Sequence, residues 1–111
     1  MTDTQFSFCV RECAAYETRE AYVSDLATSS FWGLLEDTGV PQPLIDSLGV
    51  VWDAVHRPVR EIVAASGLTQ AAFGERYCIP RRTVEDWCRG ARECPVYVRL
   101  LLQRAEGLLA M

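Results

Sequence analysis

Two short helical segments joined by a three-residue turn, within residues 67–90, constrain the fold of this chain more than any other feature. The sequence GLTQAAFGERY precedes the turn Cys-Ile-Pro, and RRTVEDWCRG follows it. Thr69 is suited to cap the first helix, and Gly90 is suited to end the second. Helices this short bury little surface alone, so we expect them to cross each other closely at Gly74. Four apolar residues are spaced to anchor the crossing: Phe73, Ile79, Val84 and Trp87.

The second of these helices has an apolar side and a charged side. If Val84 and Trp87 are hidden, the residues predicted to stay exposed are Arg81, Arg82, Glu85, Asp86 and Arg89. A helix with arginines in its exposed first turn is suited to enter the major groove of DNA. Glu85 is expected to be a solvated acid. For Asp86 two interpretations stay open, since it could accept a hydrogen bond from a cytosine amino group or orient Arg82.

The rest of the chain also has helical patterns, with glycine and proline at boundaries and no alternating strand pattern, so the expected fold class is all-α. Further helices are predicted at residues 6–15, 18–32, 44–56, 58–66 and 96–109, with a turn-rich connection at 33–43. In the last helix, the apolar positions that follow helical spacing are Tyr97, Val98, Leu101, Leu102, Ala105, Leu108 and Leu109. Because Arg57-Pro58 interrupts the pattern, we divide the chain into an N-terminal helical extension, residues 1–56, and a C-terminal domain, residues 57–111.

The two segments carry opposite net charges, although the whole chain has a net charge of −4. Residues 1–56 hold two arginines and nine acidic residues, a balance of −7. Residues 57–111 hold nine arginines and six acidic residues, a balance of +3. The C-terminal segment can therefore approach phosphate while the acidic segment stays away from it.

The pattern G-L-T-Q-x-x-F at residues 67–73, followed by a turn and R-x-T-V-x-x-W-x-x-G at residues 81–90, resembles the lambda-repressor-like, or XRE-type, helix-turn-helix family. The resemblance covers residues 58 to about 104. It implies sequence-specific binding to double-stranded DNA by a transcriptional regulator, most simply a repressor. The residues that it implies for reading base edges are Arg81, Arg82 and Asp86. Those that it implies for contacting phosphate are Gln70, Thr83, Arg89 and Arg92.

Two residues depart from the family pattern. Cys78 occupies a turn position where glycine is common, and left-handed geometry costs a residue with a Cβ about 1 kcal/mol. Pro80 stands where the family has a serine or threonine cap, which loses a capping hydrogen bond of roughly 1 kcal/mol. The fixed φ of proline partly offsets that loss.

Several classes of function are disfavoured by the sequence. It has no glycine-rich phosphate loop and no nucleophile elbow, so we expect no enzyme activity, no catalytic residue and no cofactor. Its five cysteines form no C-x-x-C pair and His56 is its one histidine, so no metal site is expected and the cysteines should pack as small apolar residues. No apolar run reaches the roughly eighteen residues of a membrane span, and the N-terminus does not resemble a secretion signal. We therefore predict a cytoplasmic protein that does not enter membranes.

The N-terminal segment is rich in large apolar residues: Phe6, Phe8, Tyr16, Tyr22, Phe31, Trp32, Leu34, Leu35 and Trp52. Burial of each is worth about 1.5 to 3 kcal/mol, so we expect the C-terminal domain, a second copy of the chain or a partner protein to cover them. A homodimer is the first expectation, because one short helix reads few base pairs. The alternative is an antitoxin whose N-terminal part binds a basic toxin while the helix-turn-helix autoregulates. A helix-turn-helix scaffold that has lost DNA binding is a further alternative.

Overall fold

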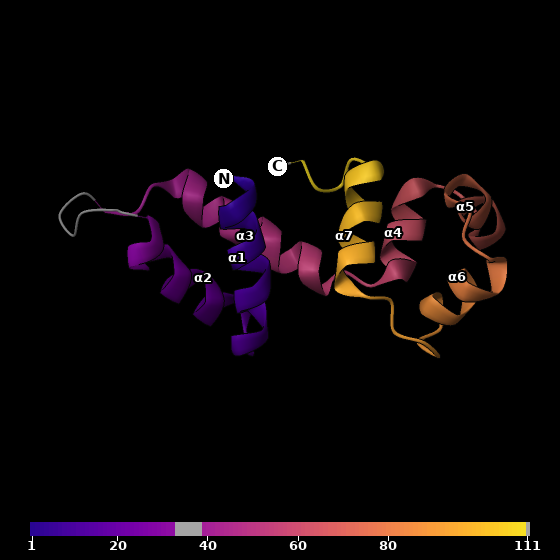
Figure 1. Cartoon of the computed structure of the whole chain (residues 1–111), viewed down its shortest axis with the longest axis horizontal. Helices are drawn as coiled ribbons and strands as arrows, with labels where there is room; N and C mark the ends of the chain where they lie inside the picture. The colour runs from indigo at the N-terminus through magenta and orange to yellow at the C-terminus, as the bar shows by residue number, and fades with distance from the viewer. Residues whose placement is uncertain (33–38, 111) are drawn as a thin grey trace. The chain divides into compact units, whose positions relative to one another are not determined.

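The computed structural model describes residues 1–32 and 39–110, and every regular element within these ranges is a helix (Figure 1). The all-α fold class is thereby confirmed. The chain divides into two compact units, an N-terminal unit, Met1–Val55, and a C-terminal unit, His56–Ala110. Among the described helices, none has the length and apolar character needed to cross a membrane. Leu34, Leu35 and the first part of the predicted connection lie outside the described residues.

The N-terminal unit contains α1 (Asp3–Glu12), η1 (Cys13–Ala15), α2 (Arg19–Ala27), η2 (Ser30–Trp32) and most of α3 (Gln42–His56). Thr18 caps α2, since its hydroxyl accepts a hydrogen bond from the Ala21 amide at 3.2 Å. The first helix begins earlier than predicted because Thr2 and Gln5 form a capping box. The second ends earlier than predicted, at Ala27, and a separate 3-10 turn follows it.

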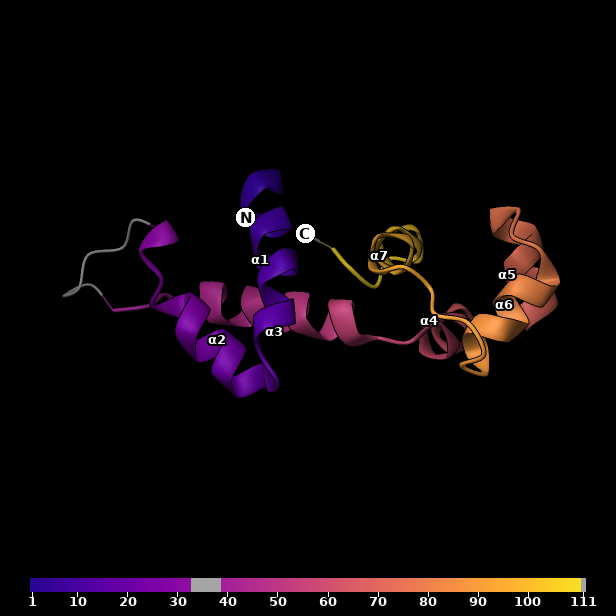
Figure 2. The ribbon, with the colours of Figure 1, turned by 60° about the horizontal axis from the view of Figure 1, so that its bottom comes forward.

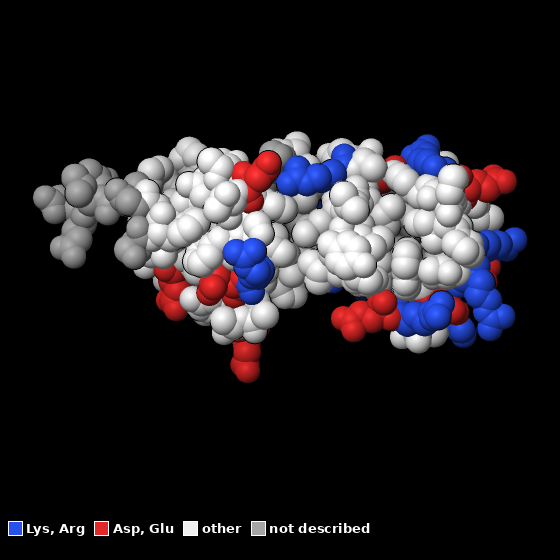
Figure 3. Space-filling model, in the orientation of Figure 1, with Lys and Arg blue, Asp and Glu red and all other residues white. Residues whose placement is uncertain are grey.

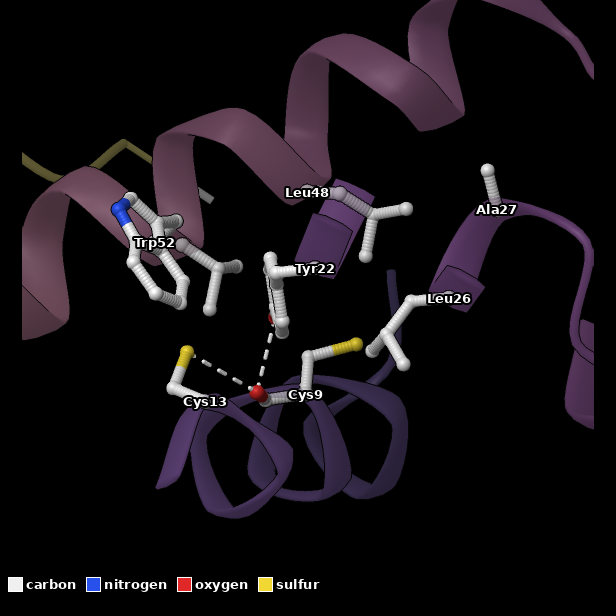
Figure 4. Packing of buried hydrophobic residues seen from close by; sticks show 8 residues of the cluster. Cys9, Cys13, Tyr22, Leu26, Ala27, Leu48 and Trp52 are labelled. Atoms are coloured by element: carbon white, nitrogen blue, oxygen red, sulfur yellow. Dashed lines mark hydrogen bonds between the residues drawn. The ribbon is translucent and has the colours of Figure 1, made fainter. Parts of the chain in front are cut away.

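A hydrophobic core lies within the N-terminal unit (Figure 4). Its buried members are Cys9, Cys13, Tyr22, Leu26, Ala27, Leu48, Val51 and Trp52. The Tyr22 hydroxyl donates a hydrogen bond to the Cys9 carbonyl oxygen at 2.8 Å, and the Cys13 thiol donates to the same oxygen at 3.4 Å. Tyr22 therefore fills the centre of the core without leaving its polar atom unpaired.

The expectation that the large apolar residues of this segment need an outside surface is wrong for most of them. Those that join the unit's own core, fully or in part, are Phe6, Phe8, Tyr16, Tyr22, Trp32 and Trp52. Phe31 is 39% exposed, although its ring stacks on Phe8 with centroids 4.2 Å apart. The described part of the segment thus buries most of these side chains against itself, because three helices are enough to enclose a small core.

The C-terminal unit contains α4 (Val59–Ser66), α5 (Gln70–Tyr77), α6 (Arg81–Cys88) and α7 (Val96–Ala105). The predicted cap of α5 is confirmed, since the Thr69 hydroxyl accepts from the Ala72 amide at 3.1 Å. Gly67 ends α4 in the left-handed region. Pro58 is the extended residue before α4 and not its first helical residue. The last helix is shorter than predicted and ends at Ala105.

All four helices of the C-terminal unit contribute residues to its core, as does Cys94 in the segment before α7. Its buried residues are Val59, Ile62, Val63, Phe73, Val84, Cys94 and Leu102. Two of the predicted anchors, Phe73 and Val84, are fully buried. The other two, Ile79 and Trp87, are only partly buried and pack against this core.

The apolar pattern predicted for residues 96–109 agrees with the structure only in part. Leu102 and Leu109 are buried, and Val98 and Leu108 pack against the core. Tyr97 is 68% exposed and Leu101 is 63% exposed, whereas Gln103 is fully buried. The Gln103 Oε1 atom accepts a hydrogen bond from Arg57 Nη1 at 2.6 Å, and its Nε2 atom donates to the Arg99 carbonyl at 3.2 Å. Arg99 Nη1 in turn donates to the Arg57 carbonyl at 2.9 Å. Hydrogen bonds to the segment before α4 therefore allow a polar side chain to be buried on α7.

Candidate nucleic-acid interface

The interface is built on the close crossing of α5 and α6, which lie side by side in Figures 1 and 2. A Cβ atom on Gly74 would lie 2.7 Å from the Ile79 carbonyl oxygen and 3.6 Å from a Val84 methyl group. The Ile79 amide also donates to the Gly74 carbonyl oxygen at 2.9 Å. The predicted role of Gly74 is confirmed, because a side chain at this position would collide with the backbone of the turn.

The turn between these helices has the geometry that the sequence predicted. Cys78 has φ 55° and ψ 37°, in the left-handed region that favours glycine. Pro80 precedes α6 and provides no side-chain cap, although its carbonyl oxygen accepts from the Thr83 amide at 2.9 Å. Helix α6 therefore begins at Arg81, which places Arg81 and Arg82 in its first turn.

Basic side chains gather over the end of the C-terminal unit formed by α5 and α6 (Figure 3). Arg81 and Arg82 are both exposed. Arg81 Nε forms an ion pair with Glu85 Oε1 at 2.8 Å, and these side chains are 72% and 42% exposed. An exposed pair of this kind is worth little in free energy, so Arg81 can exchange Glu85 for another acceptor. Glu85 therefore forms an ion pair with Arg81 as well as contacting solvent.

Asp86 is buried, so the prediction that it stays exposed on α6 is wrong, while its assignment as a base-reading residue stays a prediction. The residue is 9% exposed, and its Oδ1 atom accepts hydrogen bonds from Arg89 Nε at 3.1 Å and Arg89 Nη2 at 2.7 Å. These hydrogen bonds lower the pKa of the Asp86 carboxyl group, and the charges of Arg89, Arg82 and Arg92 lower it further. Of the two interpretations left open by the sequence, neither describes this contact, since the partner of Asp86 is Arg89.

The end of α6 forms a Schellman turn that fixes the path of the next residues. Gly90 has φ +78°, and its amide donates to the Trp87 carbonyl oxygen at 3.3 Å. The Ala91 amide donates to the Asp86 carbonyl oxygen at 2.9 Å, and the Arg92 amide donates to the same oxygen at 3.3 Å. Glycine suits the positive φ of this turn, and the turn leads the chain to the exposed Arg92.

Of the remaining residues predicted to contact phosphate, Gln70 and Thr83 lie near helix starts and Arg89 lies at the end of α6. Gln70 is the first residue of α5 and is exposed, whereas Thr83 lies in the first turn of α6 and is half-buried. The Arg89 side chain is 64% exposed despite its hydrogen bonds to Asp86. The structure therefore brings Arg81, Arg82, Arg89 and Arg92 to α6 and its two ends, while Gln70 is supplied by the neighbouring helix.

A polar cluster that the sequence analysis did not identify joins the ends of α5 and α7. Arg76 Nη1 donates to both carboxylate oxygens of Glu106, at 3.0 and 2.8 Å, and the Tyr77 hydroxyl donates to Glu106 Oε2. The Tyr77 hydrogen bond, followed by those from Arg76, holds the pKa of Glu106 below its usual value. No local pattern could reveal a contact between residues this far apart in sequence. Arg76 is thereby tied to the fold instead of being a solvated charge.

No three His, Cys, Asp or Glu residues within 1–32 and 39–110 are placed to hold a metal ion. All five cysteines are free thiols. Cys9, Cys13 and Cys94 are buried and Cys88 is partly buried, as packing residues should be, but Cys78 is exposed. The packing prediction is therefore wrong for Cys78, which the tight turn leaves on the surface.

Comparisons of the chain with protein-family models, curated proteins and solved structures found no match.

Proposed function

We propose that the C-terminal unit is a lambda-repressor-like helix-turn-helix domain and that the protein binds double-stranded DNA sequence-specifically. Its role would be that of a cytoplasmic transcriptional regulator, most simply a repressor, without catalysis or a cofactor. The observation that carries this proposal is the exposed arginine face of α6, a helix held against α5 at Gly74. The major groove of B-DNA is wide enough for an α-helix, and guanidinium groups suit the acceptors that guanine presents there.

The exposed residues of α6 and its flanks divide into two roles under this proposal. Arg81 and Arg82, in the first turn, are the candidates for base contacts, because recognition helices present their N-terminal residues to base edges. Arg89 and Arg92, at the other end, are candidates for phosphate contacts together with Gln70 and Thr83. Asp86 is omitted from the base-reading set because it is buried and its Oδ1 atom already accepts two hydrogen bonds from Arg89.

The first experiment is to select bound duplexes from random-sequence DNA and to measure the affinity of variants for them. Arg82→Ala should weaken binding to the selected site by about 1 to 3 kcal/mol and relax the preference at one base position. Arg60→Ala, which removes the same charge from an exposed position of α4, is the matched control and should retain that preference. A parent protein that binds no duplex, or normal binding by both Arg81→Ala and Arg82→Ala, would contradict the proposal.

A homodimer on a symmetric site is part of the proposal, because a single eight-residue helix contacts too few base pairs for specificity in a genome. Measurement of the mass of the full chain in solution, with and without the selected duplex, tests it. A single copy on the duplex at saturation would contradict the dimer.

The second candidate function is that of an antitoxin that binds both a toxin and DNA. The observation in its favour is that the strongly acidic part of the sequence forms a compact unit with its own core. Such a unit is able to attract a basic protein partner while the C-terminal unit contacts DNA. A toxin-like gene next to this one, and a stable complex of the two products, would support this candidate.

A further inference from the structure

We infer that the Asp86 carboxylate is a positioning residue for Arg89, which it holds in the orientation that contacts DNA phosphate. The inference rests on the proposed function and deepens it, since it assigns a role to an acidic residue inside a phosphate-binding surface. It also replaces the sequence-based view of Asp86 as a reader of bases.

The two side chains have very different surroundings. The Asp86 side chain is 12% exposed, whereas the Arg89 side chain is 64% exposed. Asp86 also belongs to the last turns of α6, where its carbonyl oxygen accepts from the Ala91 and Arg92 amides. The carboxylate is therefore fixed to a rigid part of the fold, and the guanidinium that it holds faces outward.

The hydrogen bonds leave Arg89 with donors for a second acceptor. Nε and Nη2 of Arg89 both donate to Asp86 Oδ1, at 3.1 and 2.7 Å. A guanidinium has five N–H donors in one plane, so three remain after these two bonds. Because two of its nitrogens are held, the plane of the group is fixed before DNA arrives, and less conformational entropy is lost on binding.

The charge of Asp86 and its positioning role have opposite effects on affinity for DNA. A carboxylate near phosphate repels it, so removal of the charge alone should tighten binding. Loss of the hold on Arg89 should weaken binding, because the guanidinium regains its freedom. The pKa of Asp86 is lowered, so the carboxylate is ionised at neutral pH and both effects are present in the parent protein. The sign of the change in affinity therefore shows which effect is larger.

The experiment compares Asp86→Asn with Glu93→Gln on a random-sequence duplex at low salt. Glu93 is exposed and lies just beyond Arg92, so its substitution removes one negative charge without a change at Asp86 or Arg89. We expect Glu93→Gln to bind as tightly as the parent or more tightly. Asp86→Asn should bind ~3- to 10-fold more weakly, although it makes the protein more positive, and its log–log salt slope should fall by about one phosphate contact. Random-sequence DNA excludes base reading as the cause.

An Arg89→Ala background separates positioning from other roles. Asp86→Asn should cause no further loss in that background, because the residue that it positions is absent. The folded fraction of each variant is measured by circular dichroism under the same conditions, and a change in salt slope is not expected from partial unfolding. Tighter binding by Asp86→Asn, or an equal loss in both backgrounds, would overturn the inference while DNA binding stands. A parent that binds no duplex would remove the proposed function and this role together.

Discussion

The substitution of Gly74 by alanine sets two known effects against each other at one position. Alanine stabilises the interior of a helix by about 0.8 to 1 kcal/mol relative to glycine, so helix propensity alone predicts a more stable protein. The new Cβ atom would lie 2.7 Å from the Ile79 carbonyl oxygen, inside the 3.4 Å where ordinary contact begins. That oxygen belongs to the backbone of the turn, so the collision can be relieved only if α5 and α6 move apart.

The collision should be the larger effect. Overpacking in a core costs typically 1 to 3 kcal/mol, and here a hydrogen bond from the Ile79 amide to Gly74 resists the movement. Because the Cβ atom meets backbone, the cost should lie in the upper half of that range, about 2 to 3 kcal/mol. Subtracting the gain of about 1 kcal/mol in propensity, we expect Gly74→Ala to lower the free energy of unfolding by about 1 to 2 kcal/mol. The assay is equilibrium denaturation at neutral pH, followed by the affinity for a selected duplex, which should also fall because Arg81 and Arg82 move with the turn.

Gly49→Ala is the matched control because it also adds a methyl group inside a helix. Its Cβ atom would lie 2.3 Å from Arg19 Nη2, at the end of a flexible side chain that can rotate away. The cost is the loss of the exposed ion pair between Arg19 and Asp53, which contributes about 0 to 1 kcal/mol to stability. Gly49→Ala should therefore change stability little. A Gly74→Ala protein as stable as the parent would show that the crossing of α5 and α6 is looser than described.

Two further predictions concern the stability of the C-terminal unit. Glu106→Gln should lower the free energy of unfolding at pH 7 by about 1 to 2 kcal/mol, because Glu106 accepts from Tyr77 and Arg76 as a carboxylate. The pKa of Glu106 is lowered in the folded state, so its contribution to stability is present above the unfolded-state pKa and is lost as pH falls through the folded-state pKa. The difference in free energy of unfolding between parent and variant should therefore shrink in acid. A difference that stays constant in a denaturation series over pH would contradict this. Trp87→Ala should lower the free energy of unfolding by about 3 kcal/mol, the low end for this substitution, because the ring is only partly buried. A loss below about 1 kcal/mol in the same assay would show that the packing of Trp87 contributes little.

Local features of this structure could be predicted because the interactions that cause them span only a few residues. The Thr18 and Thr69 caps each bind an amide three residues ahead, so their partners are fixed by the sequence itself. The left-handed turn at Cys78 follows from the three residues between two amphipathic helices. The role of Gly74 was predictable for the same reason, since so short a turn brings α6 back across α5.

Features that depend on the packing of distant segments could not be predicted in this way. Periodicity gave an apolar stripe on α7 but could not tell which side the other helices cover, so it did not show that Tyr97 and Leu101 are exposed. It also could not show that Gln103 is buried, because a polar side chain enters a core only where its partners are supplied, here by Arg57 and Arg99. The charge of Asp86 suggested an exposed residue, but its burial depends on what packs against α6, although its partner Arg89 lies only three residues ahead. The sequence by itself determined those helix ends that a local cap or turn sets, as at Gly67, Thr69 and Cys78, since caps and turns act locally. Only the tertiary structure decided which face of each helix meets water, since burial depends on what lies opposite.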